Sequence, residues 1–245
     1  SVANAMINMY SKCGSVYDAK LVFDQMLHHD TISWNTMLAA YVQAGQQDDA
    51  LLLFERMQSE RISMDKVTFV TLLVACTNQN TFPLAKELHH NVVSCGFDLD
   101  AVVGTVLIIT YSKSGGRVNE ARNVFNIMKQ HDVIAWNALI SVYAQQGHAE
   151  QSLQTFEEMI SKKVRPDNIT FVNLLSSCSH GGLLEEGLKF FHAMWKDYNV
   201  KPSIEHYGCV VDLYGRAGQL AEAEDFITKC SLEKQPLVWT NLLGA

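Results

Sequence analysis

Apolar side chains recur along this chain with the spacing of a helix face. Two neighbouring stretches place apolar residues at positions i, i+3, i+4 and i+7: Trp34, Met37, Leu38 and Tyr41, then Ala50, Leu53, Phe54 and Met57. Gly45 lies between them and suits the left-handed conformation that follows a helix end. Further along, at the end of an equivalent second stretch, Pro166 cannot continue a helix. The pattern predicts a hairpin of two antiparallel helices.

The hairpin pattern is repeated along the chain. A shift of about 102 residues brings the sequence into register with itself, matching Trp34-Asn35 with Trp136-Asn137, Tyr41 with Tyr143, Gly45 with Gly147, Phe54 with Phe156, and Asp65 with Asp167. A further type of unit occurs three times, as Tyr10 to Gly14, Tyr111 to Gly115 and Tyr214 to Gly218. This agreement indicates tandem repeats, grouped in threes.

Recurring polar residues, mostly acidic, mark the ends of the repeats. Cutting after them gives residues 1–30 (incomplete), 31–65, 66–100, 101–132, 133–167, 168–203 and 204–235, with 236–245 beginning an eighth repeat. One hairpin cannot bury its apolar face alone, so neighbouring hairpins must stack. The sequence therefore predicts an all-α solenoid of antiparallel helix pairs, in which the aromatic and Met residues at these apolar helix positions form the core. Because both ends fall inside a repeat, we expect a fragment from which any targeting peptide is missing.

Composition and charge limit the possible functions. Hydrophobic residues make up 48% of the 245 residues, enough for a core, and no run of eighteen apolar residues could span a membrane. The formal net charge of −7 argues against a protein held to nucleic acid mainly by neutralising phosphates. A protein that gains affinity from contacts with bases remains compatible with this charge.

The chain shows no convincing catalytic or metal-binding motif. Its six cysteines include no C-x-x-C pair, so we expect reduced, packed thiols rather than a zinc site or disulfides. His148-Ala-Glu150 fits the H-x-E of zinc deaminases, but the cysteine pair that must accompany it is missing, and His148 falls in a predicted turn. We expect no catalytic residue, metal, cofactor or small-molecule substrate in this chain.

Three motif types recur at the starts of the repeats. They occupy residues 32–38 and 133–140, then 67–73 and 169–175, then 4–10 and 204–218. In these motifs and their order the whole chain resembles the pentatricopeptide repeat family of plant organelles, in the subclass built from triplets of standard, variant and short repeats. Tetratricopeptide repeats, which bind peptides, fit less well, because here a glycine closes the first helix and the repeat length varies.

The resemblance implies a right-handed solenoid that binds single-stranded RNA, about one base per repeat. It identifies 1–30 as a partial short repeat, 31–65 and 133–167 as standard, 66–100 and 168–203 as variant, and 101–132 and 204–235 as short, the latter being final. Residues 236–245 resemble the start of the first extension motif. Full-length proteins of this subclass often continue into a cytidine-deaminase-like domain.

By the same resemblance, the fifth and last residues of each repeat read the base. Uracil, with cytosine as the weaker choice, is expected at Asn4 with Asp30, Asn35 with Asp65, and Asn137 with Asp167; guanine is expected at Thr105 with Asp132. Weak or no discrimination is expected at Val70 with Asp100, Val172 with Ser203, and Gly208 with Gln235. The expected ligand is U-U-n-G-U-n-n. Asn and Asp at such places often merely cap helices, but four Asn/Thr–Asp pairs in register favour base reading.

Two further rows of residues complete the expected RNA site. Aliphatic residues that would sandwich the bases are Ile32, Val67, Val102, Ile134 and Ile169, although ordinary packing between helices would also explain them. Lys12, Lys113 and Arg216 are candidate phosphate contacts, with solvated surface charge as the alternative.

The leading hypothesis is an RNA-binding segment that positions a mitochondrial or chloroplast transcript for C-to-U editing, with catalysis supplied by a deaminase domain or a recruited editing partner. An RNA stability or splicing factor is the alternative of the same class. A protein–protein scaffold of the tetratricopeptide kind is the alternative of another class. The periodic Asn/Thr–Asp pairs discriminate, because reading RNA requires them and binding a peptide does not.

Overall fold

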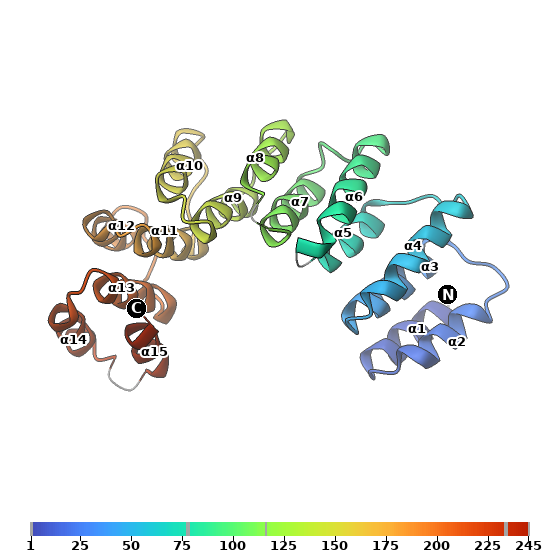
Figure 1. Ribbon diagram of the computed structural model, residues 1–245, viewed down its shortest axis with the longest axis horizontal. Coiled ribbons are helices and arrows are strands. Elements are labelled where there is room, and N and C mark those ends of the chain that lie inside the picture. Colours follow the sequence, from blue (N-terminus) through green and yellow to red (C-terminus); the bar gives the residue numbers. More distant parts are fainter. Residues whose placement is uncertain (1, 77–78, 116, 233–234, 245) are drawn as a thin grey trace. The chain divides into compact units, whose positions relative to one another are not determined.

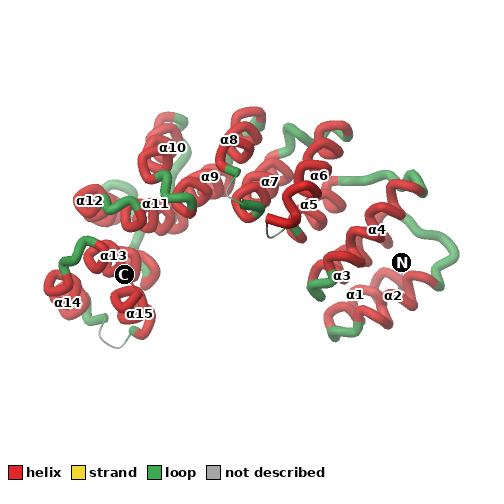
Figure 2. Tube along the Cα trace, viewed as in Figure 1, coloured by secondary structure: helices red, strands yellow, loops and turns green. Residues whose placement is uncertain are grey.

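The computed structural model describes residues 2–76, 79–115, 117–232 and 235–244, and all regular structure within them is helical (Figures 1 and 2). The helices are α1 (Val2–Lys12), α2 (Val16–Asp24), α3 (Thr31–Gln43), α4 (Gln47–Ser59), α5 (Lys66–Ala75), the 3-10 helix η1 (Gln79–Thr81), α6 (Phe82–Ser94), α7 (Ala101–Lys113), α8 (Val118–Ile127), α9 (Val133–Gln145), α10 (Ala149–Ser161), α11 (Asn168–His180), α12 (Leu184–Lys196), α13 (Ile204–Arg216), α14 (Leu220–Lys229) and α15 (Pro236–Gly244). The prediction of an all-α chain is confirmed.

The chain forms two compact bodies, which we describe separately. The N-terminal body holds the residues up to Arg117 together with Ile127–Lys129. In it α1, α3, α5 and α7 pack in succession, and α2, α4 and α6 each pack on the helix that precedes them in the hairpin (Figure 1). The result is one row of first helices and a second row of second helices, as expected for stacked hairpins.

The C-terminal body, Val118–Asn126 with the residues from Gln130 onward, has the same plan. Here α9, α11, α13 and α15 pack in succession, and α10, α12 and α14 each pack on their hairpin partner. An ion pair between Arg122 of α8 and Glu158 of α10, 2.8 Å long, joins two of the second helices.

Glycines end first helices where the sequence predicted. Gly45 and Gly147 follow α3 and α9 with φ of +71° and +72°. A side chain at either position would be strained, because only glycine adopts this left-handed conformation without cost. The chain therefore turns sharply from the first helix of a hairpin into the second.

The core of each body contains the same aromatic trio. In the first, Phe23, His29 and Trp34 lie with ring centroids 4.3–5.6 Å apart; in the second, Phe125, His131 and Trp136 lie 4.1–5.8 Å apart. Both tryptophans are buried, as are Phe54 and Met57. The predicted core role of these residues is confirmed.

All six cysteines are free, but the prediction that they are packed holds only in part. Cys76 and Cys178 are buried, and burial raises the pKa of their thiols to about 11 and about 12. Cys13 and Cys95 are exposed, so the prediction is wrong for them. Each lies directly after the last residue of a helix, where the chain turns away from the helix face that packs on its neighbours.

None of the helices in the described ranges combines the length and the apolar composition that crossing a lipid bilayer requires.

Candidate nucleic-acid interface

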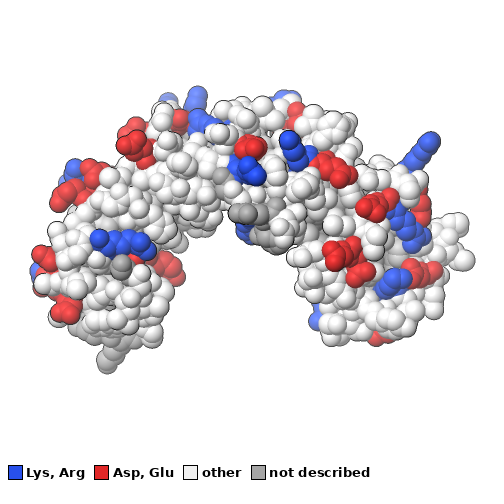
Figure 3. Space-filling model, in the orientation of Figure 1, with Lys and Arg blue, Asp and Glu red and all other residues white. Residues whose placement is uncertain are grey.

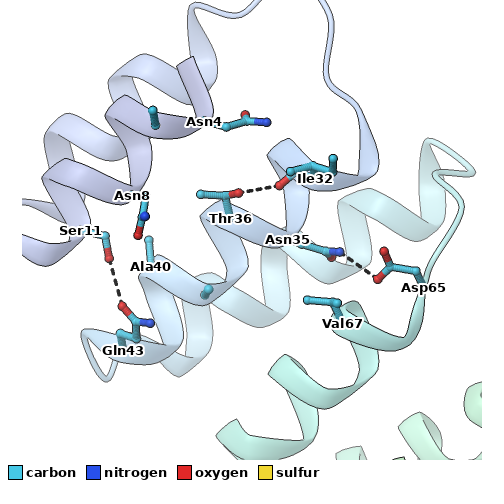
Figure 4. Close-up of a pocket in the computed structure, with 12 residues that line it drawn as sticks. Asn4, Asn8, Ser11, Ile32, Asn35, Thr36, Ala40, Gln43, Asp65 and Val67 are labelled. Carbon is cyan, nitrogen blue, oxygen red and sulfur yellow. Dashed lines mark hydrogen bonds between the residues drawn. The ribbon is translucent and has the colours of Figure 1, made fainter. Parts of the chain in front are cut away.

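A groove of about 530 Å³ runs along the first helices of the N-terminal body. Its lining comes from α1, α3 and the start of α5, and comprises Asn4, Ala5, Asn8, Ser11, Ile32, Asn35, Thr36, Ala39, Ala40, Gln43, Asp65 and Val67 (Figure 4). Three predicted base readers and two predicted base-sandwiching residues thus share one groove. Stacking the hairpins aligns the starts of successive first helices, which is why residues far apart in sequence meet here.

At the centre of the groove, Asn35 and Asp65 form a directly bonded pair. Asn35 Nδ2 donates a hydrogen bond of 2.9 Å to Asp65 Oδ1 (Figure 4). Thr68, which the sequence interpretation had missed, completes the arrangement: its Oγ1 lies 2.7 Å from Asn35 Oδ1 and 3.1 Å from Asp65 Oδ1. The backbone N–H of Thr68 also donates to Asp65 Oδ1, at 2.9 Å.

The C-terminal body reproduces this network. Asn137 Nδ2 donates to Asp167 Oδ1 at 2.9 Å, and Thr170 Oγ1 lies 2.6 Å from Asn137 Oδ1 and 3.0 Å from Asp167 Oδ1. Asn137 is buried to nearly the same degree as Asn35, with 6% and 7% of their surfaces exposed. The same chemistry therefore occurs at two separate repeats, which argues for a function common to both.

Each aspartate of these pairs also caps a helix. Asp65 and Asp167 are the N-caps of α5 and α11, and Thr68 and Thr170 close the reciprocal hydrogen bonds of a capping box. Capping and pairing with asparagine are therefore not alternatives at these sites. One carboxylate performs both, because the cap position brings its oxygen beside the first helix of the repeat that the aspartate ends.

Two predicted base-reading carboxylates, Asp65 in the groove and Asp30, are held in their ionised form. Burial would raise the pKa of Asp65, but hydrogen bonds from the Thr68 backbone and the Asn35 side chain outweigh it, and the pKa is lowered. The pKa of Asp30 is also lowered, chiefly by hydrogen bonds from the Ser33 side chain and backbone and also by one from Asn4. At neutral pH both groups are negatively charged acceptors.

Three further predicted base readers, Thr105, Asp132 and Asp100, make other contacts. The side chain of Thr105 donates back to Ala101 O at 2.8 Å; its proposed partner Asp132 belongs to the C-terminal body, where it caps α9 through Ala135 N. Asp100 caps α7 and forms an ion pair with Lys66, 3.4 Å long.

The repeat at residues 204–235 has a glycine, Gly208, at its fifth position, close to a side chain of α15. A methyl group built on Gly208 would lie 2.6 Å from Asn241 Nδ2, a side chain of α15. A larger residue at this position would require the side chain of Asn241 to move. Gln235, its proposed partner, is exposed just before α15.

The predicted base-sandwiching residues lie on the surface. Ile32, Val67, Val102, Ile134 and Ile169 expose between 50% and 63% of their surface. Ordinary packing between helices would bury such side chains, so that alternative explains this row poorly. Exposed aliphatic residues beside polar readers are instead suited to contact with a flat, partly apolar ligand.

The candidate phosphate contacts differ in whether they form an ion pair within the protein. Lys12 and Lys113 are exposed and form no ion pair with any of the described residues. Arg216 is held by Asp212 at 3.1 Å, and Asp212 also accepts the hydroxyl of Ser179. On the face shown in Figure 3, basic and acidic side chains alternate and no broad basic patch is visible.

In place of an aspartate cap, α13 begins with Ser203 and the buried His206. The Ser203 backbone donates to His206 Nδ1 at 3.1 Å, and Nε2 lies 3.0 Å from Asn168 O. The carbonyl can only accept, so the neutral ring carries its proton on Nε2. Burial lowers the pKa of His206 below 6.5, although the Asn168 carbonyl and Glu205 oppose this.

We therefore expect the C-terminal body to lose stability in mild acid. The contribution of the neutral ring is fully present above pH 6.5 and is lost as the pH falls from 6.5 toward the lower pKa of the folded state. Hydrogen exchange should show weaker protection of α11 and α13 at about pH 5 than at about pH 7. The variant His206→Gln should lack this pH dependence; a variant that kept it would contradict the assignment.

Comparison with known proteins agrees with the fold and the repeat pattern. The model described as "PPR repeat family" matches residues 29–78 and 131–180, and the model described as "PPR repeat" matches 1–30, 169–198 and 205–229. Together these matches cover well over half of the chain.

Similar sequences and structures point the same way. Two mitochondrial pentatricopeptide repeat-containing proteins of Arabidopsis thaliana, one of them named as putative, are 38% and 40% identical across the whole chain, which spans 38% and 39% of their lengths. The crystal structure of the pentatricopeptide repeat protein PPR10 from maize matches 97% of this chain and 35% of its own, at 21% identity and a TM-score of 0.69. PPR10 in complex with an 18-nt psaJ RNA element matches 94% of this chain and 39% of its own, at 17% identity and a TM-score of 0.54. The chain is a member of the pentatricopeptide repeat family.

Proposed function

We propose that this chain is a sequence-specific, single-stranded RNA-binding segment that reads about one base per repeat. The observation that carries the proposal is the Asn–Asp–Thr network, present at Asn35 and again at Asn137. A helix cap needs only the aspartate and the backbone of the next helix. Capping does not require the buried asparagine that contacts the cap from the first helix of the repeat, whereas base reading does.

The Asn–Asp–Thr network leaves available the hydrogen-bonding groups that a uracil base requires. The hydrogen bonds from Asn35 Nδ2 and the Thr68 backbone N–H both end on Asp65 Oδ1, so we expect Oδ2 to accept a base N–H. Asn35 uses one of its two Nδ2 protons on Asp65, which leaves the other to donate to a base carbonyl. Uracil offers an N3–H beside a carbonyl oxygen. Cytosine presents an unprotonated N3, which an ionised carboxylate would repel.

The exposed aliphatic residues supply the second part of a base site. Ile32 and Val67 line the same groove as Asn35 and come from successive first helices. A base lying between them would contact apolar groups on both faces while its edge meets Asn35 and Asp65. Such face contacts tolerate any base, so affinity and specificity are supplied by different side chains.

The names of the relatives support a proposal for where in the cell the chain binds RNA. Relatives among the sequence matches are named as mitochondrial, and PPR10, which shares the fold, has been crystallised with RNA. The chain spans 30–42% of the length of its curated relatives. We propose that it is the reading segment of a longer organellar protein, which positions a transcript for C-to-U editing by a deaminase supplied elsewhere in that protein or by a partner.

Binding to defined oligonucleotides tests the proposal. An RNA with the core U-U-A-G-U-A-A, flanked by adenosines, should bind more tightly than RNAs in which one U of the core is replaced by A, by about 1–3 kcal/mol for each replacement. The dependence on salt should be shallow, because the formal net charge is −7 and no broad basic patch is visible on the face shown in Figure 3. Equal affinity for the core and for a scrambled core, measured at one salt concentration, would reject sequence-specific reading.

A further inference from the structure

A hydroxyl group accompanies every asparagine reader of the chain. Counting three residues past the end of each repeat gives a buried hydroxyl where the preceding reader is asparagine: Ser33 after Asn4, Thr68 after Asn35, and Thr170 after Asn137. Where the reader is threonine, valine or glycine, the same position has no hydroxyl, being Val103, Ala135, His206 and Val238. A helix cap alone does not explain this, because Asp100 and Asp132 cap α7 and α9 without such a hydroxyl.

The hydrogen-bond geometry shows what the threonine hydroxyl does beside Asn35 and Asn137. Beside Asn4 the hydroxyl of Ser33 instead donates to Asp30 Oδ1, at 2.7 Å. Thr68 Oγ1 accepts from the Asp65 backbone N–H at 3.2 Å and lies 2.7 Å from Asn35 Oδ1 and 3.1 Å from Asp65 Oδ1. Its single proton goes to the nearer oxygen, which is that of the asparagine amide. Thr170 has the same partners at 3.0, 2.6 and 3.0 Å.

This bond acts together with the Asp65 carboxylate, which can only accept, to decide which end of the amide faces which neighbour. The two ends of an asparagine amide have nearly the same shape, and only their hydrogen bonds distinguish them. With Thr68 donating to Oδ1, the amide nitrogen must lie on the side of Asp65, where its second proton remains for the ligand. Without that donor, the nearly buried Oδ1 would lack its partner, and turning the amide oxygen toward the groove would relieve the cost.

We propose that Thr68 and Thr170 are positioning residues that set base specificity by locking the reader amide with its N–H groups toward the carboxylate and the base. The inference rests on the proposed RNA reading and adds a third determinant, located in the repeat that follows the reader. A locked amide donates and therefore favours a base carbonyl, as in uracil. A released amide can also accept, and so tolerates the amino group of cytosine.

The test compares uracil with cytosine at two positions of one RNA. Starting from the core U-U-A-G-U-A-A, one RNA has cytosine at its second position, opposite Asn35, and another has cytosine at its fifth, opposite Asn137. Dissociation constants are measured for the unchanged chain, Thr68→Val and Thr170→Val at fixed salt. Thr68→Val should lower the preference for U over C at the second position about fivefold or more and leave the fifth unchanged. Thr170→Val should do the reverse, so each variant is the control for the other.

Further variants separate positioning from a purely structural effect. Thr68→Ser keeps the hydroxyl and should restore the preference for uracil. Loss of helix capping alone would weaken binding of both RNAs by the same factor, and an unchanged ratio of U to C would overturn the inference. If Thr68→Val does not fold, Thr68→Ala and Thr170→Val carry the same test. If the unchanged chain shows no preference for uracil at either position, the proposed function itself fails, a result distinct from the failure of the positioning role.

Discussion

Replacement of Trp136 by alanine is expected to lower the free energy of unfolding of the C-terminal body by about 3–5 kcal/mol. The ring is 3% exposed and lies against Phe125 and His131, with centroids 4.7 and 5.8 Å away. Its Nε1 is buried without a hydrogen-bond partner among the described residues, so the substitution strands no other polar group. The loss is therefore one of packing and of the cavity that remains.

The effect should stay close to the substitution. Each hairpin packs mainly on its neighbours, so damage at α9 should reach α8, α10 and α11 before it reaches α1 or α3. Trp34→Ala is the matched control, because Trp34 occupies the same place in the aromatic trio of the N-terminal body. Hydrogen exchange should show each variant loosening its own body. Uniform loosening of the whole chain by either variant would contradict the repeat architecture.

Much of the fold could be predicted from the sequence, because the features that specify it are local. Apolar spacing specified the helices, and Gly45 and Gly147 marked the turns through the one conformation that favours glycine. The stacked hairpins followed because an isolated hairpin cannot bury its apolar face. The pairing of Asn35 with Asp65 was expected from the resemblance to the pentatricopeptide repeat family.

What the sequence did not predict depends on contacts between neighbouring repeats. Thr68 lies three residues beyond the end of its reader's repeat, and only packing shows that its hydroxyl reaches Asn35. The side chain of Asn241, on α15, lies close to Gly208, the fifth position of the preceding repeat. The exposure of Cys13 and Cys95 depends on where the chain leaves a helix, which apolar spacing does not specify. The coincidence of hydroxyl and asparagine was visible in the sequence, but its meaning was not.

The central claim is that the Asn–Asp pair selects the base, and exchanging the asparagine should exchange the base. In the resembled family, threonine with aspartate favours guanine, whereas asparagine with aspartate favours uracil. Asn35→Thr should therefore lose about 1–3 kcal/mol of affinity for RNA with uracil at the second position and gain affinity for RNA with guanine there. Reading at the fifth position should be unchanged, because Asn137 lies in the other body and distant sites act nearly independently.

The most direct measurement is the set of dissociation constants of the unchanged chain, Asn35→Thr and Asn137→Thr for RNAs that carry U or G at the second or fifth position, at one salt concentration. The account predicts a crossover from U to G at the second position for Asn35→Thr and at the fifth for Asn137→Thr, each leaving the other position as it was. If Asn35 only packs against the cap of α5, each variant will bind all four RNAs more weakly by one common factor. That absence of crossover would contradict base reading by these pairs.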